Sequence, residues 1–248
     1  CKGIGATPEG IETNPALYDF LFELPWMSSQ PNSDEWLKEY SYARYGVNPD
    51  DNALAWEALK NLRKSVWNCT RDQQGTSEAI ILGRPRWTFG DNSRGSMNNL
   101  DGTSVSSWSK SSIYWDVQDV MLAADNLISI SDLVTTDDGE ANFSYDLIDI
   151  TRQSLVDFAY YLLQDINAAR NAGNDEEYRR LYTIFLDLML GIDEMLSYDA
   201  NFQLQRWTSL ARNIADEVDG TDDNDRNWLE WNARTQVTVW SKGNTDLH

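Results

Sequence analysis

Apolar residues recur at intervals of three and four positions through most of this 248-residue chain. This spacing puts apolar side chains along one face of an α-helix, whereas the alternation typical of half-buried strands is weak throughout. The runs that show it lie at residues 33–67, 113–130, 145–171, 174–196, 202–218 and 223–239. The sequence therefore predicts a mainly α fold. Its 41% of hydrophobic residues, eleven Trp among them, is enough for a sizeable core.

Local signals set the expected ends of the first helices. A short helix over 15–24 should end at Pro25, which lacks the backbone N–H that an α-helix needs. We expect Ser33 to cap the next helix and Gly46 to stop it. The segment Asn48–Asp51 combines a cap residue, a proline and two acids, and it predicts the start of a third helix.

The helical spacing is lost over residues 70–111, which are rich in Gly, Ser, Asn and Thr. A segment of this length is usually functional or disordered. Its embedded aromatics favour an ordered loop near a site, with a flexible tether as the alternative; they are Trp87, Phe89 and Trp108. We interpret Asp137–Glu140 and Asp219–Asp225 as acidic turns.

Charge excludes two classes of partner. Forty acidic against twenty basic residues give a net charge of −20, without the basic stripe that nucleic acids or anionic membrane surfaces require. Apolar runs such as Leu186–Ile192 are interrupted by Asp and fall far short of the roughly 20 residues of a membrane span. We therefore expect no nucleic-acid partner and no membrane partner.

The residues that remain for chemistry are carboxylates and aromatics. The only histidine is His248, so a His-based triad or multi-His metal site is excluded within this sequence, and no cysteine pair has zinc spacing. We expect no metal and no cofactor. Enzymes that act on sugars use carboxylates as acid, base and nucleophile, and aromatic rings to contact sugar faces.

Glu9 is the carboxylate whose surroundings are most unusual. It lies in Thr7-Pro8-Glu9-Gly10, between a glycine-rich start and the first helix. If the start is a barrel strand, Glu9 occupies the end of that strand, where barrel enzymes build their active sites. The local sequence alone favours the alternative of an exposed turn glutamate.

Five segments resemble the α-N-acetylglucosaminidases of glycoside hydrolase family 89. The segment 3–14, GIGATPEGIETN, resembles that family's PEGI segment, and Trp36 to Gly46 resembles its W…RRYG helix with Ala43 in place of the first Arg. Ala55-Trp56, the segment 145–153 (YDLIDITRQ) and the segment 232–240 (NARTQVTVW) resemble further landmarks in the same order. Together they cover nearly the whole chain.

The resemblance implies a fold and an activity. It implies retaining hydrolysis of terminal α-linked N-acetylglucosamine, by a (β/α)8-type barrel followed by an all-α domain. Residues 1–30 would be the end of the barrel, and residues 31–248 most of the helical domain, cut short at its end. Glu9 matches the nucleophile, while the acid/base glutamate belongs to an earlier segment absent here. We expect the isolated chain to be inactive, with the N-terminal remainder of the enzyme as its partner.

The resemblance also suggests pocket residues. Trp240 and one of Tyr114 and Trp115 would line the sugar pocket, with a buried core Trp as the alternative for Trp240. Asn14 either contacts substrate or caps the helix at Pro15, and propensity favours the cap. We interpret the other helix-spaced aromatics as core: Trp56, Trp67, Phe158, Phe185, Trp207 and Trp228.

Arg152 and Arg234 lie within apolar helices, where a buried guanidinium must be paired. We expect each to bind an acidic residue of another helix rather than substrate. Two rival functions remain open: a non-catalytic helical module for carbohydrate binding or protein docking, and a purely structural helical domain. The resemblance further implies a lysosomal, secreted or periplasmic location.

Overall fold

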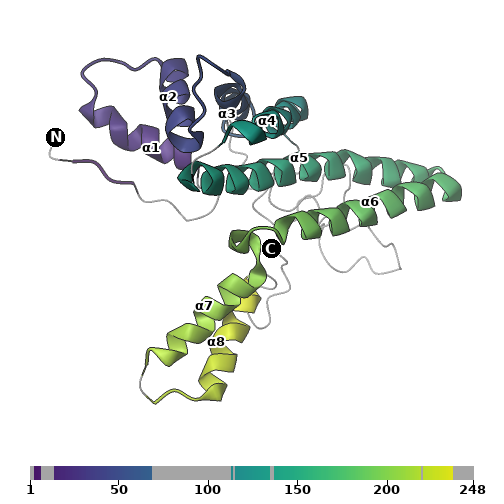
Figure 1. Cartoon of the computed structure of the whole chain (residues 1–248). Helices are drawn as coiled ribbons and strands as arrows, with labels where there is room; N and C mark the ends of the chain where they lie inside the picture. Colours follow the sequence, from purple (N-terminus) through teal and green to yellow (C-terminus); the bar gives the residue numbers. More distant parts are fainter. Residues whose placement is uncertain are drawn as a thin grey trace. The chain divides into compact units, whose positions relative to one another are not determined.

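The computed structural model describes residues 3–6, 14–68, 113, 115–134, 137–218 and 220–236, and within them every regular element is a helix. In chain order these are α1 (Pro15–Glu23), η1 (Leu24–Trp26), α2 (Ser33–Tyr45), α3 (Leu54–Lys64), α4 (Val117–Ser129), η3 (Ser131–Leu133), α5 (Asp137–Asn171), α6 (Asp175–Leu196), η4 (Ala200–Phe202), α7 (Leu204–Asp216) and α8 (Asp223–Gln236) (Figure 1). The predicted α class is confirmed. Residues 3–6 carry no regular structure, so the barrel strand stays a prediction.

The helices fall into two compact units. The first contains α1 to α4 and the start of α5, up to Ser154. The second contains the rest of α5, from Leu155, with α6, α7 and α8. The division therefore lies inside the longest helix of the described chain, which spans 35 residues. The domain boundary expected at residue 30 of a whole enzyme stays a prediction.

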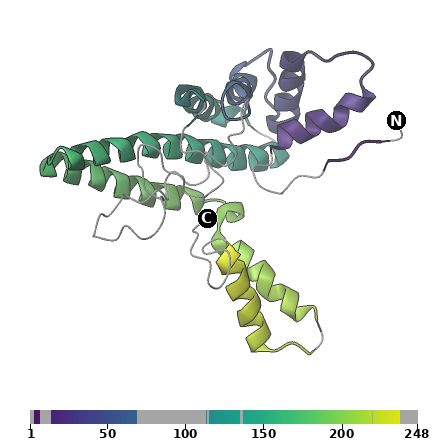
Figure 2. The same ribbon diagram turned by 180° about the vertical axis from the view of Figure 1, so that it is seen from behind.

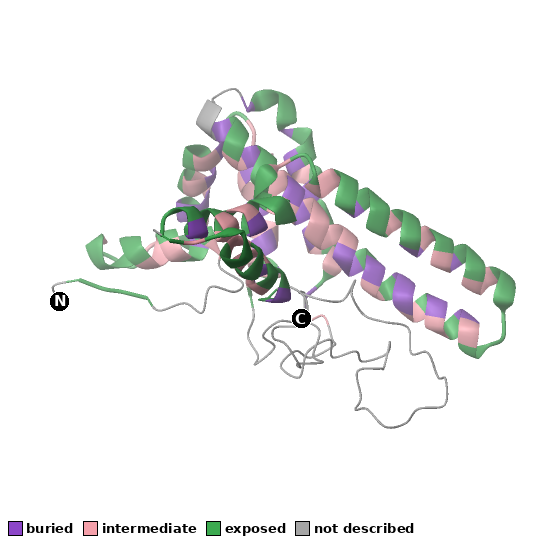
Figure 3. Cartoon of the chain, turned by 90° about the horizontal axis from the view of Figure 1, so that it is seen from below, coloured by how far each residue is buried: buried purple, intermediate pink, exposed green. Residues whose placement is uncertain are grey.

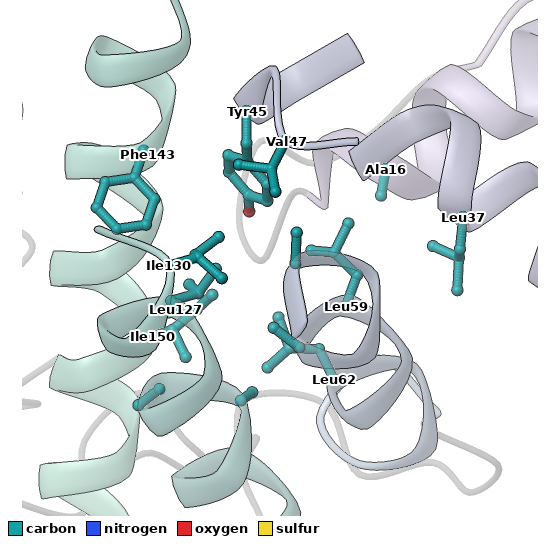
Figure 4. Close-up of a cluster of buried hydrophobic side chains, with 14 of the residues drawn as sticks. Ala16, Leu37, Tyr45, Val47, Leu59, Leu62, Leu127, Ile130, Phe143 and Ile150 are labelled. Carbon is teal, nitrogen blue, oxygen red and sulfur yellow. The ribbon is translucent and has the colours of Figure 1, made fainter. Parts of the chain in front are cut away.

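The first unit has a core to which five helices contribute, from α1 to α5. Figure 4 shows side chains from α3, α4, α5 and the end of α2 converging on one another. Tyr45 is completely buried and meets the ring of Phe143 edge to face, with ring centroids 6.1 Å apart. Small residues let α3 and α4 pack along each other, because Ala55, Ala58 and Ala123 are all fully buried.

The second unit consists of two helix pairs. Both views show α5 and α6 side by side (Figures 1 and 2), and buried residues follow the face that each presents to the other (Figure 3). That contact is apolar and is made by Ala159, Leu162, Leu163, Ile166, Ala169, Leu181 and Phe185. The spacing of these residues, at three and four positions, is the pattern read from the sequence.

The other pair, α7 with α8, meets through small residues. Thr208, Ala215 and Ala233 are buried in these helices, and the indole Nε1–H of Trp207 donates to the carbonyl of Ala233 at 2.9 Å. The larger apolar residues of the pair lie on the exposed surface: Leu204, Trp207, Leu210, Ile214, Trp228 and Trp231. This pair therefore keeps an apolar surface open to solvent.

The expected core aromatics are only partly confirmed. Phe185 is buried as predicted, and Trp56 and Trp67 are half-buried. The prediction is wrong for three others, which are about half exposed: Phe158, Trp207 and Trp228. Helical spacing identifies the apolar face of a helix, but it does not show whether the described chain supplies a partner for that face.

Two predicted helix starts differ from the structure. The cap of α2 is Asn32, whose side-chain oxygen accepts from the N–H of Asp34 at 2.9 Å, and Ser33 is already helical. Asn48–Asp51 form a separate turn, closed by the N–H of Asn52 donating to the carbonyl of Asn48. The third helix begins one turn later, at Leu54. The predicted stop at Gly46 is confirmed, with φ at +73°.

One further expectation is corrected. Asp137–Glu140 is not a turn but the first turn of α5. The helix end predicted at Pro25 is confirmed to within one residue: α1 stops at Glu23, and Pro25 lies in the 3₁₀ turn η1 that follows. Residues 70–111 lie outside the described residues. Of the helices that are described, none combines the length and apolar character that crossing a membrane requires.

Candidate functional site

An ion pair joins α2 to the start of α5. The Arg44 guanidinium donates to both carboxylate oxygens of Asp146: Nη2 reaches Oδ1 at 2.7 Å, and Nε donates to Oδ2. The phenol of Tyr45 donates to the same Oδ2 at 2.7 Å. Asn142, one turn before Asp146, donates from Nδ2 to the carbonyl of Arg44 at 3.3 Å. Two segments that resemble family motifs, ARYG and YDLIDITRQ, therefore meet at this point.

The ionisation of this group follows from its burial. Hydrogen bonding to Asp146 raises the pKa of Arg44, so the guanidinium stays charged. Burial raises the pKa of Tyr45 well above its ordinary value of 10.0, and the neighbouring Asp146 carboxylate adds to the shift. The tyrosine is therefore a neutral donor at physiological pH. Arg44 and Tyr45 both donate to Asp146, so the donors and the acceptor of this group bind one another. This arrangement suits a positioning role rather than proton transfer to a substrate.

Aromatic rings connect this ion pair to α1. The Trp36 ring stacks on Tyr40 with centroids 5.0 Å apart and planes 17° apart, and Phe20 meets it edge to face at 4.9 Å. Trp36 Nε1–H donates to the Glu23 carboxylate at 2.7 Å. The Arg44 guanidinium lies 5.9 Å from the centre of the Tyr40 ring. Rings and charges thus form one continuous group across α1, α2 and α5.

A cavity of about 380 Å³ opens beside this group. We call it the α1–α2 cavity, because most of its lining comes from these two helices. Three carboxylates line it (Asp19 and Glu23 of α1, Glu39 of α2), with the stacked rings of Trp36 and Tyr40. Ala43, Arg44 and Asn142 complete the lining. The lining of this cavity therefore combines carboxylates with aromatic side chains.

The sequence did not identify this cavity, although the spacing of its residues was visible. Asp19 and Glu23 are four apart on one helix, as are Glu39 with Ala43 and Tyr40 with Arg44. Residues four apart share a helix face. What the sequence could not provide was the packing of α1 against α2, which brings the two faces together. One contact between these faces is the hydrogen bond from the Trp36 indole to Glu23.

Asn14 takes the capping role that its propensity favours. Its side-chain oxygen accepts from the N–H of Leu17 at 3.3 Å, and it has the extended backbone of a cap residue. It also lines a smaller cavity of about 120 Å³, together with Phe20, Trp36 and Trp67. The cap residue itself lies five residues after Glu9, and it fixes where α1 begins.

Of the other predicted pocket residues, the structure describes one. Trp115 is buried, just before the cap of α4 at Asp116. Glu9, Tyr114 and Trp240 lie outside the described residues. In the part of the chain that the structure describes, no group of three His, Cys, Asp or Glu is arranged to hold a metal ion.

Arg152 and Arg234 were expected to bind acidic residues of other helices, but each binds an acidic residue of its own helix. Arg152 donates to Asp149, three residues earlier in α5, at 2.8 Å. Arg234 donates to Glu230, four residues earlier in α8, at 2.7 Å, and Glu230 also accepts from Arg212 of α7. Both side chains are partly exposed, so the deep burial assumed for them is wrong.

Comparison with known proteins gives relatives over nearly the whole chain. Alpha-N-acetylglucosaminidase of Homo sapiens is 27% identical over 244 residues, covering 96% of this chain and 28% of the human protein. A family 89 glycoside hydrolase of Clostridium perfringens, solved with its substrate GlcNAc-α-1,4-galactose, is 29% identical with a TM-score of 0.77. The match covers 96% of this chain and 24% of that one.

The same Clostridium hydrolase, solved with 2-acetamido-1,2-dideoxynojirmycin, gives a TM-score of 0.78 at 30% identity, over 96% of this chain and 25% of that one. This chain thus spans about a quarter of the length of these relatives. Residues 36–248 match the family described as Alpha-N-acetylglucosaminidase (NAGLU) C-terminal domain. Since that match includes most of the chain, the protein belongs to the α-N-acetylglucosaminidase C-terminal domain family.

Proposed function

We propose that this chain is part of a retaining glycoside hydrolase that removes terminal α-linked N-acetylglucosamine from glycans. One observation carries the proposal: 96% of the chain shares its fold with a hydrolase solved together with GlcNAc-α-1,4-galactose. The human relative carries the name of the same activity. The motifs shared with this family run in order along the sequence, from the PEGI segment to NARTQVTVW.

In this proposal Glu9 is the nucleophile. A retaining hydrolase needs two carboxyl groups about 5–5.5 Å apart, one to attack the anomeric carbon and one to protonate the leaving oxygen. Attack by Glu9 would form a glycosyl-enzyme and release the aglycone alcohol, and water would then hydrolyse that ester with the second carboxylate as base. The net result is hydrolysis with the α configuration retained.

The acid/base glutamate comes from the preceding part of the enzyme. Glu23, the described glutamate nearest to Glu9 in the sequence, is bound by the indole of Trp36 at 2.7 Å. An acid must be within hydrogen-bond reach of the leaving oxygen, and Glu23 is committed elsewhere. In this proposal the chain supplies the nucleophile of the catalytic pair and the rest of the enzyme supplies the acid/base.

The exposed face of the first helix supports the N-terminal remainder of the enzyme as the partner. Leu17 and Phe22 of α1 are 58% and 42% exposed, and Trp26 of η1 is 82% exposed. We assign these exposed side chains of α1 and η1 to the interface with that remainder. The part of the relatives that this chain does not cover, about three quarters of their length, supplies a partner of sufficient size.

The sugar would be held by aromatic residues around Glu9. We assign Tyr114 or Trp115 and Trp240 to the wall of the pocket, where rings contact the sugar face. The cap at Asn14 would set the position of Glu9 by fixing the start of α1. The family resemblance also implies an extracytoplasmic location, which would be lysosomal, secreted or periplasmic.

Complementation tests the proposal. The 248-residue chain is assayed with an aryl α-N-acetylglucosaminide, alone and after co-expression with the part of the Clostridium hydrolase that precedes the matched region. We expect no turnover from either part and turnover from the pair, with the α anomer as the first product by NMR. Glu9→Gln should lower the rate by about 10⁴-fold. Turnover by the chain alone would contradict the missing acid/base group.

A further inference from the structure

The smaller cavity, beside the cap of α1, has the size of one apolar side chain. We call it the Asn14 cavity; its volume is about 120 Å³. Most of its lining is apolar, with Ala16 and Phe20 from α1, Leu37 from α2, and Trp67 just beyond α3. Apolar cavities of about 150 Å³ take up one benzene molecule. The Asn14 cavity is slightly smaller, so it has room for a single aliphatic side chain.

The polar side chains that line the Asn14 cavity are already bound within the chain. Asn14 accepts from the N–H of Leu17 at 3.3 Å. The Arg63 guanidinium donates to Ser33 Oγ at 2.9 Å and also to Asp34. A polar occupant would compete with these bonds, whereas an aliphatic occupant gains apolar contacts and breaks none of them. The cavity therefore favours an aliphatic occupant.

The position of the Asn14 cavity indicates which part of the chain supplies that occupant. The cap Asn14 and two residues of the first turn, Ala16 and Leu17, line it. Side chains of a helix tilt toward its N-terminus, so those of the first turn lean toward the residues that precede the helix. Leu17 is 58% exposed, which leaves apolar surface to be covered there. An apolar residue before the cap often covers such a turn.

Ile11 is the large aliphatic residue among residues 7–13, TPEGIET, which lead into α1. Thr13, the residue next to the cap, is polar. Ile11 precedes Asn14 by three residues, a span of at most about 11 Å, so its side chain can reach a cavity that Asn14 itself lines. We propose that the side chain of Ile11 occupies the Asn14 cavity and thereby anchors the segment that carries Glu9.

The anchor would make Ile11 a positioning residue for the reaction, a consequence that rests on the proposed function of Glu9. Only Gly10 separates Glu9 from Ile11, so their Cα atoms lie within about 7 Å of each other. An anchored Ile11 therefore restricts where the Glu9 carboxylate can be placed. Such restriction matters because misplacement of a reacting group by about 1 Å can lower a rate about 10²-fold.

NMR of the 248-residue chain tests the contact without requiring activity. The chain is labelled at the δ1 methyl groups of isoleucine, and the signal of Ile11 is the one that disappears in Ile11→Val. We expect nuclear Overhauser effects from this methyl to the ring protons of Phe20 and Trp67, which line the cavity. A methyl signal without contact to either ring would overturn the proposal, whatever else fills the cavity.

Thermal unfolding of the same chain adds a matched comparison. Ile11→Ala should lower the midpoint by about 5 °C, because it empties an occupied apolar cavity. The control is Ile4→Ala, the same substitution at an isoleucine that is 43% exposed. It should change the midpoint by about 2 °C or less. Equal shifts for the two variants would contradict an anchor at Ile11.

Kinetics of the complemented enzyme test the positioning role. Ile11→Ala should lower kcat about 10²-fold and leave KM within about threefold, because the substrate site is intact but Glu9 is misplaced. Ile11→Val keeps most of the apolar contact and should retain kcat within about fivefold. A raised KM with normal kcat in Ile11→Ala would contradict the positioning role. The NMR contact needs no turnover, so failure of the hydrolase proposal and failure of the anchor are distinguishable.

Discussion

Arg44 and Asp146 stand 102 residues apart in the chain and form a two-point ion pair, with Nη2 donating to Oδ1 at 2.7 Å and Nε donating to Oδ2. Both side chains are largely buried, at 17% and 14% exposure. The pair connects α2 with α5, while α3 and α4 occupy the sequence between them. The ion pair thus links two helices of the first unit that lie far apart in the sequence.

Removal of this ion pair should destabilise the chain strongly. Asp146→Asn leaves the Arg44 charge without its partner in a largely buried position, which costs about 3 kcal/mol of unfolding free energy. Urea denaturation followed by circular dichroism measures the change. The matched control is Asp149→Asn, which removes an exposed pair with Arg152 three residues along the same helix. It should cost about 0.5 kcal/mol or less, and equal losses would contradict the assigned role.

Tyr45 gives the chain a specific response to alkali. Its folded-state pKa is raised by burial and by Asp146, so the native state holds a proton that the unfolded chain releases near pH 10.0. The stability from this shift is complete below the unfolded value and is lost as pH rises toward the folded value. The free energy of unfolding should therefore fall above about pH 10.

Tyr45→Phe separates this contribution from the rest. At about pH 8 it should cost about 2 kcal/mol, because the hydrogen bond to the Asp146 carboxylate is lost. Above about pH 10 the gap between the two proteins should narrow, since only the tyrosine form loses stability by ionising there. Denaturation curves across this range provide the measurement. A constant gap would show that Tyr45 does not titrate on unfolding.

Much of the fold was predictable because it depends on local signals. The apolar spacing predicted the helices, Gly46 ended α2, and propensity favoured the cap at Asn14. The failures arise where two signals compete. Ser33 and Asn32 are both good caps. Asn48–Asp51 carries all the features of a helix start yet forms one turn, and the Asn52 side chain accepts from the N–H of Leu54, where α3 begins.

Two glycines offer a direct comparison of backbone conformation. A Cβ would meet open space at both Gly173 and Gly191, but Gly173 has φ at +68° whereas Gly191 lies inside α6. Gly173→Ala should therefore cost about 1 kcal/mol, and Gly191→Ala should stabilise the chain by about 0.5–1 kcal/mol. Thermal unfolding of the two variants measures the difference. The same sign for both would contradict the geometry of the α5–α6 connection.

Substitutions at Asn14 distinguish a role as helix cap from a role in substrate binding. Asn14→Ala should cost about 1 kcal/mol, while Asn14→Asp should retain stability because aspartate caps equally well. In the complemented enzyme, a pure cap predicts that Asn14→Asp leaves KM unchanged. A raised KM with normal stability would instead place the Asn14 amide in contact with the sugar.

The site was harder to predict than the fold. Arg44, Tyr45 and Asp146 belong to segments that resemble family motifs, but the sequence did not show that these segments meet. The contacts that join them cross about a hundred residues, and no local pattern encodes such a distance. Exposed aromatics such as Trp228 were wrongly predicted to be core residues for a related reason. Helical spacing identifies the apolar face of a helix, but it does not identify what covers that face.

The role of Glu9 as nucleophile is the central claim, and trapping of the covalent intermediate tests it most directly. The complemented enzyme is inactivated with a fluorinated analogue of N-acetylglucosamine bearing an activated leaving group, and its peptides are analysed by mass spectrometry. The account predicts one added sugar on the peptide that contains Glu9, and no label after Glu9→Gln. A label on any other carboxylate, in an enzyme that turns over substrate, would contradict the account.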